Sequence, residues 1–459
     1  MPVTKSLTNV TANAATNSAT NAATHVVTHV VTHVATHTVM DPLTGESPTV
    51  QLAGESPRRP SIKLDRSVRG NAASLMVSPA PNFSGSRLIT PERPVGQPFQ
   101  ALQYTSERSE SVKVALFGLG RWGSHWLRKF ADHPQAELVA VVDPCVDRLE
   151  LAQQGLTDRA IATYTDWRKA LEIPGLAAVA IITPASTHYE MIQTALQHNL
   201  HVLAEKPLTL ETAKAIELCQ LADQQQRQLV IDHTYLFNAA VQRGRCLVQQ
   251  GQLGQLRYGY ASRTHLGPVR HDVDALWDLA IHDIAIFNHW LNDVPVRVQA
   301  QGHQWLHLEP WETLKQSDLS HPSSPGLADL VWIKLTYASG FEAIVQLCWA
   351  NPDKQRRLSL VGSEGSLVFD ELAAFPLTLW QGQLCRQAGQ FVPQNQQQQV
   401  IELEPIEPLQ AVCDHFLSCV RHNQPSEISS GWLGAELVTI LAALSQSLQA
   451  GGVPIAISH

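Results

Sequence analysis

The segment from Val112 to Phe130 constrains the fold of this chain more than any other stretch. An apolar run, Val112–Phe117, leads into Gly-Leu-Gly-Arg-Trp-Gly, and a helical segment follows. In the pattern G-x-G-x-x-G the first glycine permits a tight turn, the second lets the backbone approach a pyrophosphate, and the third lets helix and strand pack closely. The free N–H groups at the helix N-terminus then favour an anion. We predict a dinucleotide site that includes Gly118, Gly120, Arg121, Trp122 and Gly123.

A second apolar strand supports this prediction. Leu138–Val142 ends in Asp143, about 20 residues beyond the last glycine, where such folds place an acidic residue. A carboxylate there can accept hydrogen bonds from both ribose hydroxyls, and it would repel the additional phosphate of NADP. NAD is therefore the expected cofactor. NADP remains an alternative, because Arg121 and Arg148 could neutralise a 2′-phosphate.

The rest of the chain shows two textures. From Val112 to about residue 233, apolar strand-like runs alternate with helical segments, which predicts a parallel sheet. Beyond about residue 255 longer alternating strands dominate, and a helical close runs from about Leu409 to Leu448. We predict an α/β fold with a Rossmann dinucleotide-binding domain at 111–233. A substrate-binding α/β domain with a mostly antiparallel, open sheet is expected at 234–459.

Residues 1–110 differ from both. Threonine recurs at every fourth residue from Thr16 to Thr36, with histidines in step at His25, His29, His33 and His37. Prolines and serines continue without periodicity, and such a segment cannot bury enough apolar surface to offset its ordering entropy. We predict a disordered low-complexity tail. On a helix the four histidines would align for a metal, but a drifting repeat accounts for them, and no metal is expected.

Composition narrows the class of protein. A formal net charge of -8 argues against a nucleic-acid partner, and we expect no apolar run long enough to span a membrane. The seven cysteines are scattered and form no C-x-x-C pair, as is typical of reduced thiols in the cytosol. A cytoplasmic enzyme with a small-molecule substrate is the expectation. A transit peptide, or a later start of synthesis at Met40 or Met76, stays open.

Two segments carry candidate proton chemistry. Lys206 follows the strand His201–Ala204, at the carboxyl edge of the sheet where ligands of open α/β folds bind. Its ammonium can orient a substrate hydroxyl and stabilise developing alkoxide charge. His282 is the candidate base, because an imidazole titrates near physiological pH. Asp278 lies one helical turn earlier, where it could orient that ring, and His289 on the same stripe is the competing histidine.

These segments resemble the Gfo/Idh/MocA family, which includes glucose–fructose oxidoreductase and inositol dehydrogenase. Thr183-Pro184 with His188, Glu205-Lys206-Pro207, and Asp278 with His282 match its motifs in the expected order. The resemblance runs from about residue 112 to the C-terminus. It implies that the cofactor is also contacted by Thr183, Pro184, His188, Glu205, Lys206 and Pro207. It further implies substrate contacts from Tyr235, Arg263, Trp277 and His282, and a homo-dimer or tetramer.

The expected activity is that of an NAD-dependent dehydrogenase acting on a CH–OH group of a sugar, nucleotide sugar or cyclitol. His233–Asn238 and the run Trp277–Asp283 look closest to family members that oxidise C3 of nucleotide sugars. Two alternatives remain: a reductase of a non-sugar substrate on the same fold, and a non-catalytic NAD-binding regulator. Regulators descended from such enzymes typically lose the lysine or the histidine, and this chain has both.

Overall fold

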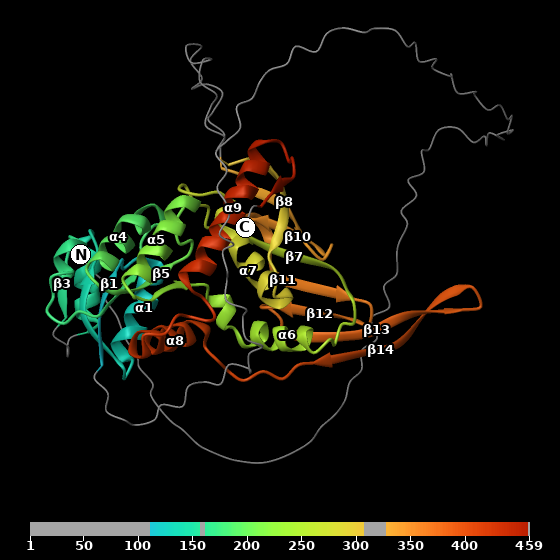
Figure 1. The fold of residues 1–459 in the computed structure, drawn as a ribbon, viewed down its shortest axis with the longest axis horizontal. Coiled ribbons are helices and arrows are strands. Elements are labelled where there is room, and N and C mark those ends of the chain that lie inside the picture. Colours follow the sequence, from blue (N-terminus) through green and yellow to red (C-terminus); the bar gives the residue numbers. More distant parts are fainter. Residues whose placement is uncertain (1–110, 157–160, 307–326, 458–459) are drawn as a thin grey trace, which may run out of the picture. The chain divides into compact units, whose positions relative to one another are not determined.

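The computed structural model of the chain describes residues 111–156, 161–306 and 327–457. The predicted tail at 1–110 and its four histidines lie outside these residues. Two β-sheets carry the described fold, one of six strands and one of nine (Figure 1). The predicted fold class, a parallel Rossmann sheet followed by a mostly antiparallel sheet, is confirmed.

The six-stranded sheet has the order β3-β2-β1-β4-β5-β6, and every neighbouring pair is parallel. The order reverses between β1 and β4, so the loops that follow these two strands diverge and leave room for a ligand at their carboxyl ends. The strands are β1 (Val112–Phe117), β2 (Ala136–Val142), β3 (Ala162–Tyr164), β4 (Ala178–Ile181), β5 (His201–Glu205) and β6 (Leu229–Asp232).

Helices cover both faces of this sheet, and its strands are therefore buried on both sides. The side chains of β4 are all buried, which is why its sequence is a continuous apolar run rather than an alternating one. The helices are α1 (Arg121–Asp132), α2 (Val146–Gln154), α3 (Trp167–Ala170), α4 (Ala185–Gln197) and α5 (Thr212–Gln224). Trp126 and Phe130, one helical turn apart on α1, are fully buried and stack at 5.4 Å between ring centroids.

The nine-stranded sheet has the order β14-β13-β12-β11-β7-β10-β9-β8-β15 and is antiparallel except between β7 and β10. Its strands are β7 (Leu256–Leu266), β8 (Pro295–His303), β9 (Leu330–Tyr337), β10 (Glu342–Cys348), β11 (Ala350–Gly362), β12 (Gly365–Asp370), β13 (Leu377–Gln387), β14 (Gln390–Val400) and β15 (Ile455–Ala456). The far ends of β13 and β14 extend as a two-stranded arm (Figure 1).

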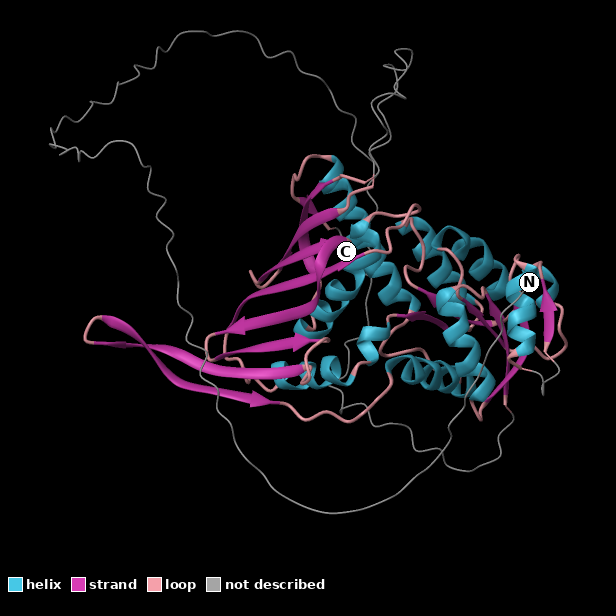
Figure 2. Ribbon diagram, turned by 180° about the vertical axis from the view of Figure 1, so that it is seen from behind, coloured by secondary structure: helices cyan, strands magenta, loops and turns pink. Residues whose placement is uncertain are grey.

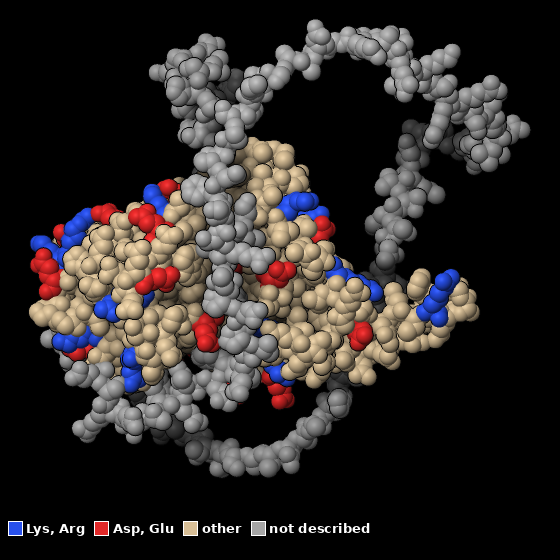
Figure 3. All heavy atoms as spheres, in the orientation of Figure 1, with Lys and Arg blue, Asp and Glu red and all other residues tan. Residues whose placement is uncertain are grey.

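Helices lie on one face of the larger sheet only (Figure 2). A 3-10 turn, η1 (Thr234–Phe237), and α6 (Ala239–Gln249) lead into β7; a π-helical turn, η2 (Leu276–Ala280), leads directly into α7 (Ile281–Leu291). The opposite face exposes aromatic and branched side chains from several strands, which is unusual for a solvent-exposed surface. These are Tyr258, Tyr260, Trp332, Ile344 and Trp380. On the face seen in Figure 3, basic and acidic side chains are interspersed.

The last two helices pack against elements of both the six-stranded and the nine-stranded part of the fold. Helix α8 (Pro408–His422) packs against α1 and η1, and α9 (Gly431–Gln449) packs against α5, β6 and β8. The expectation that no apolar run could span a membrane is wrong for α9, which is long and apolar enough by composition. However, 61% of its apolar window is buried within the protein, as in a core helix.

Candidate active site

The glycine turn after β1 is built by close backbone contacts within the protein. Gly118 has φ of +92°, and a Cβ there would lie 2.3 Å from the Ile182 carbonyl oxygen. A Cβ on Gly123 would lie 2.0 Å from the Gly118 oxygen. Both positions therefore require glycine for the fold itself.

Gly120 is different, because within the described residues a Cβ built on it has open space and meets no atom within 4 Å beyond its own stretch of chain. It is the N-cap of α1, yet no side chain caps this helix and no acidic residue occupies its first turn. The N-terminal N–H groups of α1 are thus left without a side-chain acceptor. The empty space and the uncapped helix fit the phosphates of a dinucleotide. Arg121 and Trp122 follow in the exposed first turn.

Asp143 ends β2 as predicted, but its carboxylate is more enclosed than expected. It is 2% exposed and accepts hydrogen bonds from the backbone N–H of Leu119 at 2.7 Å and of Cys145 at 2.9 Å. Arg148 lies 3.4 Å from its Oδ2. The carboxylate thus stabilises the glycine turn through its backbone hydrogen bonds, and a half-exposed arginine lies beside it.

The turns after β4 and β5 are tied together by His188. Its Nδ1 lies 2.8 Å from the Pro207 oxygen and its Nε2 3.0 Å from the Thr183 oxygen. The ring is fully buried, and burial lowers its pKa. Both ring nitrogens thus lie against backbone oxygens of the protein, and the cofactor contact expected of His188 stays a prediction. It positions the turns that carry Pro184 and Pro207.

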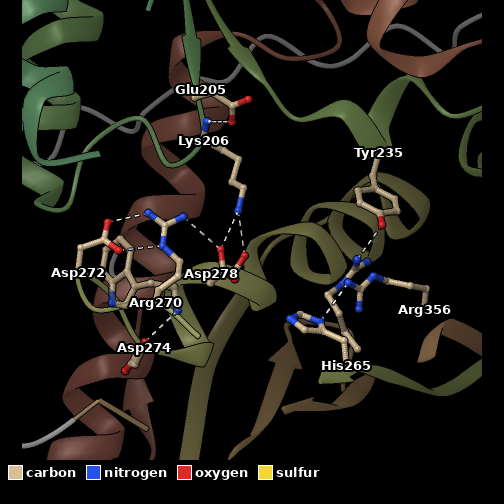
Figure 4. A network of polar contacts seen from close by, with 11 residues as sticks. Glu205, Lys206, Tyr235, His265, Arg270, Asp272, Asp274, Asp278 and Arg356 are labelled. Atoms are coloured by element: carbon tan, nitrogen blue, oxygen red, sulfur yellow. Dashed lines mark hydrogen bonds and ion pairs between the residues drawn. The ribbon is translucent and has the colours of Figure 1, made fainter. Parts of the chain in front are cut away.

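Lys206 and Asp278 meet although 72 residues separate them (Figure 4). The Lys206 Nζ donates to the Asp278 carbonyl oxygen at 2.9 Å and lies 3.5 Å from Oδ1. Arg270 approaches the same Oδ1 at 3.5 Å and binds Asp272 at 2.6 and 2.9 Å. We call Lys206, Arg270, Asp272 and Asp278 the lysine cluster.

The expected contact between Asp278 and His282 is not present in the part of the chain that the structure describes. The cause is competition: Asp278 lies in the π-helical turn before α7, where two cations share its carboxylate. His282 instead lies beside Tyr235, with ring centroids 4.8 Å apart. Burial, followed by the charges of Lys206 and Arg263, lowers the pKa of His282 well below its usual value. The imidazole is therefore neutral and can accept a proton.

On the sheet side, the predicted substrate residue Arg263 is committed to other protein groups. Its Nε and Nη2 bind the two oxygens of Asp283 at 2.7 and 3.1 Å, and both residues are buried. Its Nη1 donates to the Tyr235 hydroxyl at 2.8 Å. Arg263 thus acts through Tyr235, whose own hydroxyl donates to Glu371 at 2.5 Å.

Two further residues of this region were missed in the sequence. Arg356 donates to His265 Nδ1 at 3.1 Å, and Glu371 lies 3.9 Å from the Arg356 Nε. The alternation of side chains along β11 could have pointed to Arg356 in the sequence. Leu358 and Leu360 are fully buried, and Arg356, two residues before Leu358, lies on the same face of the strand. A cation on the buried face of a strand needs a reason. We call Tyr235, Arg263, His265, Arg356 and Glu371 the arginine cluster.

The remaining predicted residues support the site from outside. Glu205 and Asp232 are register partners on β5 and β6, and burial raises the pKa of both carboxyls. The charge of Asp232 raises the pKa of Glu205 further, whereas the hydrogen bond between the two lowers that of Asp232. Trp277 donates from Nε1 to Ser445 on α9 at 2.8 Å, so it holds the turn before α7. Within the described residues no group of three His, Cys, Asp or Glu side chains could hold a metal ion.

Comparison with known proteins agrees with this geometry. Two sequence profiles of one family match: the NAD-binding Rossmann-fold oxidoreductase profile at residues 112–233 and the C-terminal domain profile at residues 241–368. A putative oxidoreductase from Magnetospirillum magnetotacticum is a similar solved structure. It is 28% identical with a TM-score of 0.59, and the alignment covers 73% of this chain and 100% of that one.

Curated relatives point the same way. UDP-N-acetylglucosamine 3-dehydrogenase of Acidithiobacillus ferrooxidans is 30% identical over 42% of this chain, and the aligned part spans 58% of that relative. The NAD-dependent scyllo-inositol 2-dehydrogenase of Bacillus subtilis is 26% identical over 57% of this chain and 74% of the relative. With both profiles matched in order and the parallel and antiparallel sheets in place, the chain belongs to the Gfo/Idh/MocA family of oxidoreductases.

Proposed function

We propose that this protein is an NAD-dependent dehydrogenase that oxidises a secondary alcohol of a sugar, nucleotide sugar or cyclitol. The observation that carries the proposal is the meeting of Lys206, from the carboxyl edge of the parallel sheet, with the η2–α7 segment that bears His282. An ammonium and a neutral imidazole are the two groups that alcohol oxidation needs beside a hydride acceptor. The dehydrogenase relatives act on alcohols of this kind.

Each residue has a distinct role in the proposed reaction. When bound, the nicotinamide cofactor supplies the hydride acceptor. The Lys206 ammonium, held by Asp278, orients the substrate hydroxyl and stabilises charge on its oxygen. His282 is the group that accepts the hydroxyl proton: its lowered pKa keeps the ring unprotonated at neutral pH, and it also makes the imidazole a weaker base than a free histidine. Asp278 therefore positions Lys206, in place of the His282-orienting role expected from the sequence.

NAD is the proposed cofactor rather than NADP. Asp143 places a buried carboxylate at the end of β2, where a 2′-phosphate would be repelled. Its contact to Arg148 is long, at 3.4 Å, and the arginine is half-exposed, so it can move away and free an oxygen for a ribose hydroxyl. The same arginine is what would favour NADP. Calorimetric titration with each cofactor decides between them, and tighter binding of NADP would overturn this choice.

A homo-oligomer is also proposed, by way of the helix-free face of the large sheet. The exposed aromatic side chains there form an apolar surface that a second copy would cover. Native mass measurement tests this. A cytoplasmic location is proposed as well, because all seven cysteines are free thiols, as expected in a reducing compartment.

The proposed activity is tested with the full chain, NAD and a panel of sugars, nucleotide sugars and inositols, following the absorbance of reduced nicotinamide. Turnover on one class, abolished in Lys206→Met, is the expected result. No turnover across the panel, with NAD binding established by calorimetry, would reject the proposal. It would favour the non-sugar reductase or the regulator.

A further inference from the structure

Two arginines face each other across neighbouring strands of the large sheet. In the antiparallel pairing of β11 with β7, Arg356 is the register partner of Arg263. Directly opposite like charges destabilise a sheet unless other groups compensate them. Each of the two guanidinium groups therefore needs a carboxylate or another anion nearby.

Arg263 is fully compensated and Arg356 is not. Arg263 holds both oxygens of Asp283 at 2.7 and 3.1 Å. The carboxylate beside Arg356 belongs to Glu371, at 3.9 Å, and that carboxylate already accepts the Tyr235 hydroxyl at 2.5 Å. Among the residues that the structure describes, the Nη1 of Arg356 donates to neutral backbone oxygens alone, of Thr264 at 3.3 Å and Gln355 at 3.1 Å. Burial and the charge of Arg263 lower the pKa of Arg356 accordingly.

His265 adds a second donor next to this arginine. Its Nδ1 accepts the Arg356 Nη2–H at 3.1 Å, so the neutral ring carries its proton on Nε2. Burial, followed by the positive charge of Arg356, lowers the pKa of His265 and keeps the ring neutral, while the charge of Asp278 acts in the opposite direction. Cations and N–H donors thus gather at this end of β7 and β11, and the carboxylates of Glu371, Asp283 and Asp278 that act on them are already engaged by Tyr235, Arg263 and the lysine cluster.

We propose that Arg356 and His265 bind an anionic group of the substrate, a carboxylate or a phosphoryl group. This rests on the proposed function, because it assigns the reacting hydroxyl to Lys206 and His282 and the anion to the arginine cluster. Figure 4 shows Arg270, Asp272 and Asp278 of the lysine cluster on one side, and Tyr235, His265 and Arg356 of the arginine cluster on the other. An anion here would supply the compensation that Arg356 lacks. A neutral polyol would not.

Matched probes test the proposal by calorimetry on the full chain. NAD is titrated first, and the saturated protein is then titrated with glucose against glucuronate, and with myo-inositol against myo-inositol 1-phosphate. In at least one pair the anionic member should bind about tenfold tighter or more, as expected for a charge-assisted contact. The preferred pair identifies the anion as carboxylate or phosphoryl. If NAD fails to bind, the proposed function fails, and the probes are titrated without it.

Two variants separate the site from general surface charge. Arg356→Gln should reduce the preference for the anion to within about threefold, while Arg356→Lys should keep most of it. Arg357→Gln is the control: it removes an equal charge from the neighbouring, half-exposed residue, which pairs with Asp370 at 3.7 Å. Thermal unfolding verifies that each variant folds.

The proposal is overturned by any of three results. One is equal binding of both members of both pairs, another is failure of both anionic probes to bind, and the third is an equal loss in Arg357→Gln. A preference that disappears only in Arg356→Gln, and weakens with added salt, supports it.

Discussion

The glycine turn of the parallel sheet and the two charged clusters of the candidate site differ in the kind of contact that holds them. In the turn the contacts involve backbone atoms: Leu119 N–H binds Asp143, and Gly118 and Gly123 pack against the carbonyl oxygens of Ile182 and Gly118. In the clusters side chains meet across the chain: Lys206 reaches Asp278 across 72 residues, and Tyr235 reaches Glu371 across 136. The first region is determined by backbone geometry within the parallel sheet, and the second by side-chain packing between distant segments.

This difference separates what each region contributes. Substitutions in the turn should change cofactor affinity and local folding, whereas substitutions in the clusters should change turnover or the stability of the packed sheet and helices. The comparison would fail if substitutions in the turn changed turnover and substitutions in the clusters changed cofactor affinity.

The largest effect is expected for Lys206→Met. Loss of the ammonium beside the reacting oxygen should lower turnover by about 10³-fold while leaving NAD affinity within about threefold. Steady-state kinetics and calorimetry measure the two quantities. Lys214→Met is the control, because Lys214 forms an exposed pair with Glu211 on the same domain. Equal losses of turnover in both variants would remove Lys206 from the site.

Next in size is the buried ion pair of the arginine cluster. Arg263→Met leaves Asp283 buried and uncompensated, so unfolding free energy should fall by about 3 kcal/mol. Chemical denaturation measures it, with Arg357→Gln expected to cost less than about 1 kcal/mol as an exposed pair. A second substitution, Asp283→Asn, should restore part of the loss. A stability equal to that of Arg357→Gln would contradict the burial seen here.

His282→Asn should lower turnover by about 10²-fold, because the proton acceptor is lost. In the unsubstituted protein, alcohol oxidation should hold its rate as pH falls through 6, because the lowered pKa keeps His282 unprotonated there. Activity should then fall only in more acidic solution. A decline centred at the ordinary histidine value would contradict the assignment, as would an equal loss in His289→Gln.

The smallest effects separate two glycines of one motif. Gly118→Ala places a Cβ against the Ile182 oxygen at positive φ, so it should destabilise the fold by about 2 kcal/mol. Gly120→Ala places its Cβ in open space within the described structure, so it should fold normally and lose about tenfold in NAD affinity. Thermal unfolding and calorimetry on both variants measure this, and equal destabilisation would show that Gly120 also serves the fold.

The sequence predicted the parallel sheet, its order of elements and the antiparallel second sheet because strand and helix periodicities are local. Motif and family resemblance also proposed Lys206, His282, Tyr235 and Arg263 as site residues, but they did not predict the partners that these side chains have in the structure. His188 carries a cofactor-side motif yet is buried between two turns, and Asp278 is drawn to Lys206 and Arg270.

Arg356 and Glu371 were missed for the same reason. They come from β11 and the turn after β12, far from any motif, and only the pairing of β7 with β11 brings them to Tyr235. Strand register across such distances depends on the whole sheet, so spacing along the chain does not reveal it.

The most direct test of the central claim follows the hydrogen on the oxidised carbon. The best substrate from the panel is prepared with deuterium at that carbon and incubated with NAD and the full chain. The account predicts that deuterium appears in the recovered reduced cofactor and that Lys206→Met suppresses the transfer. Product formation with no deuterium in the cofactor would contradict it.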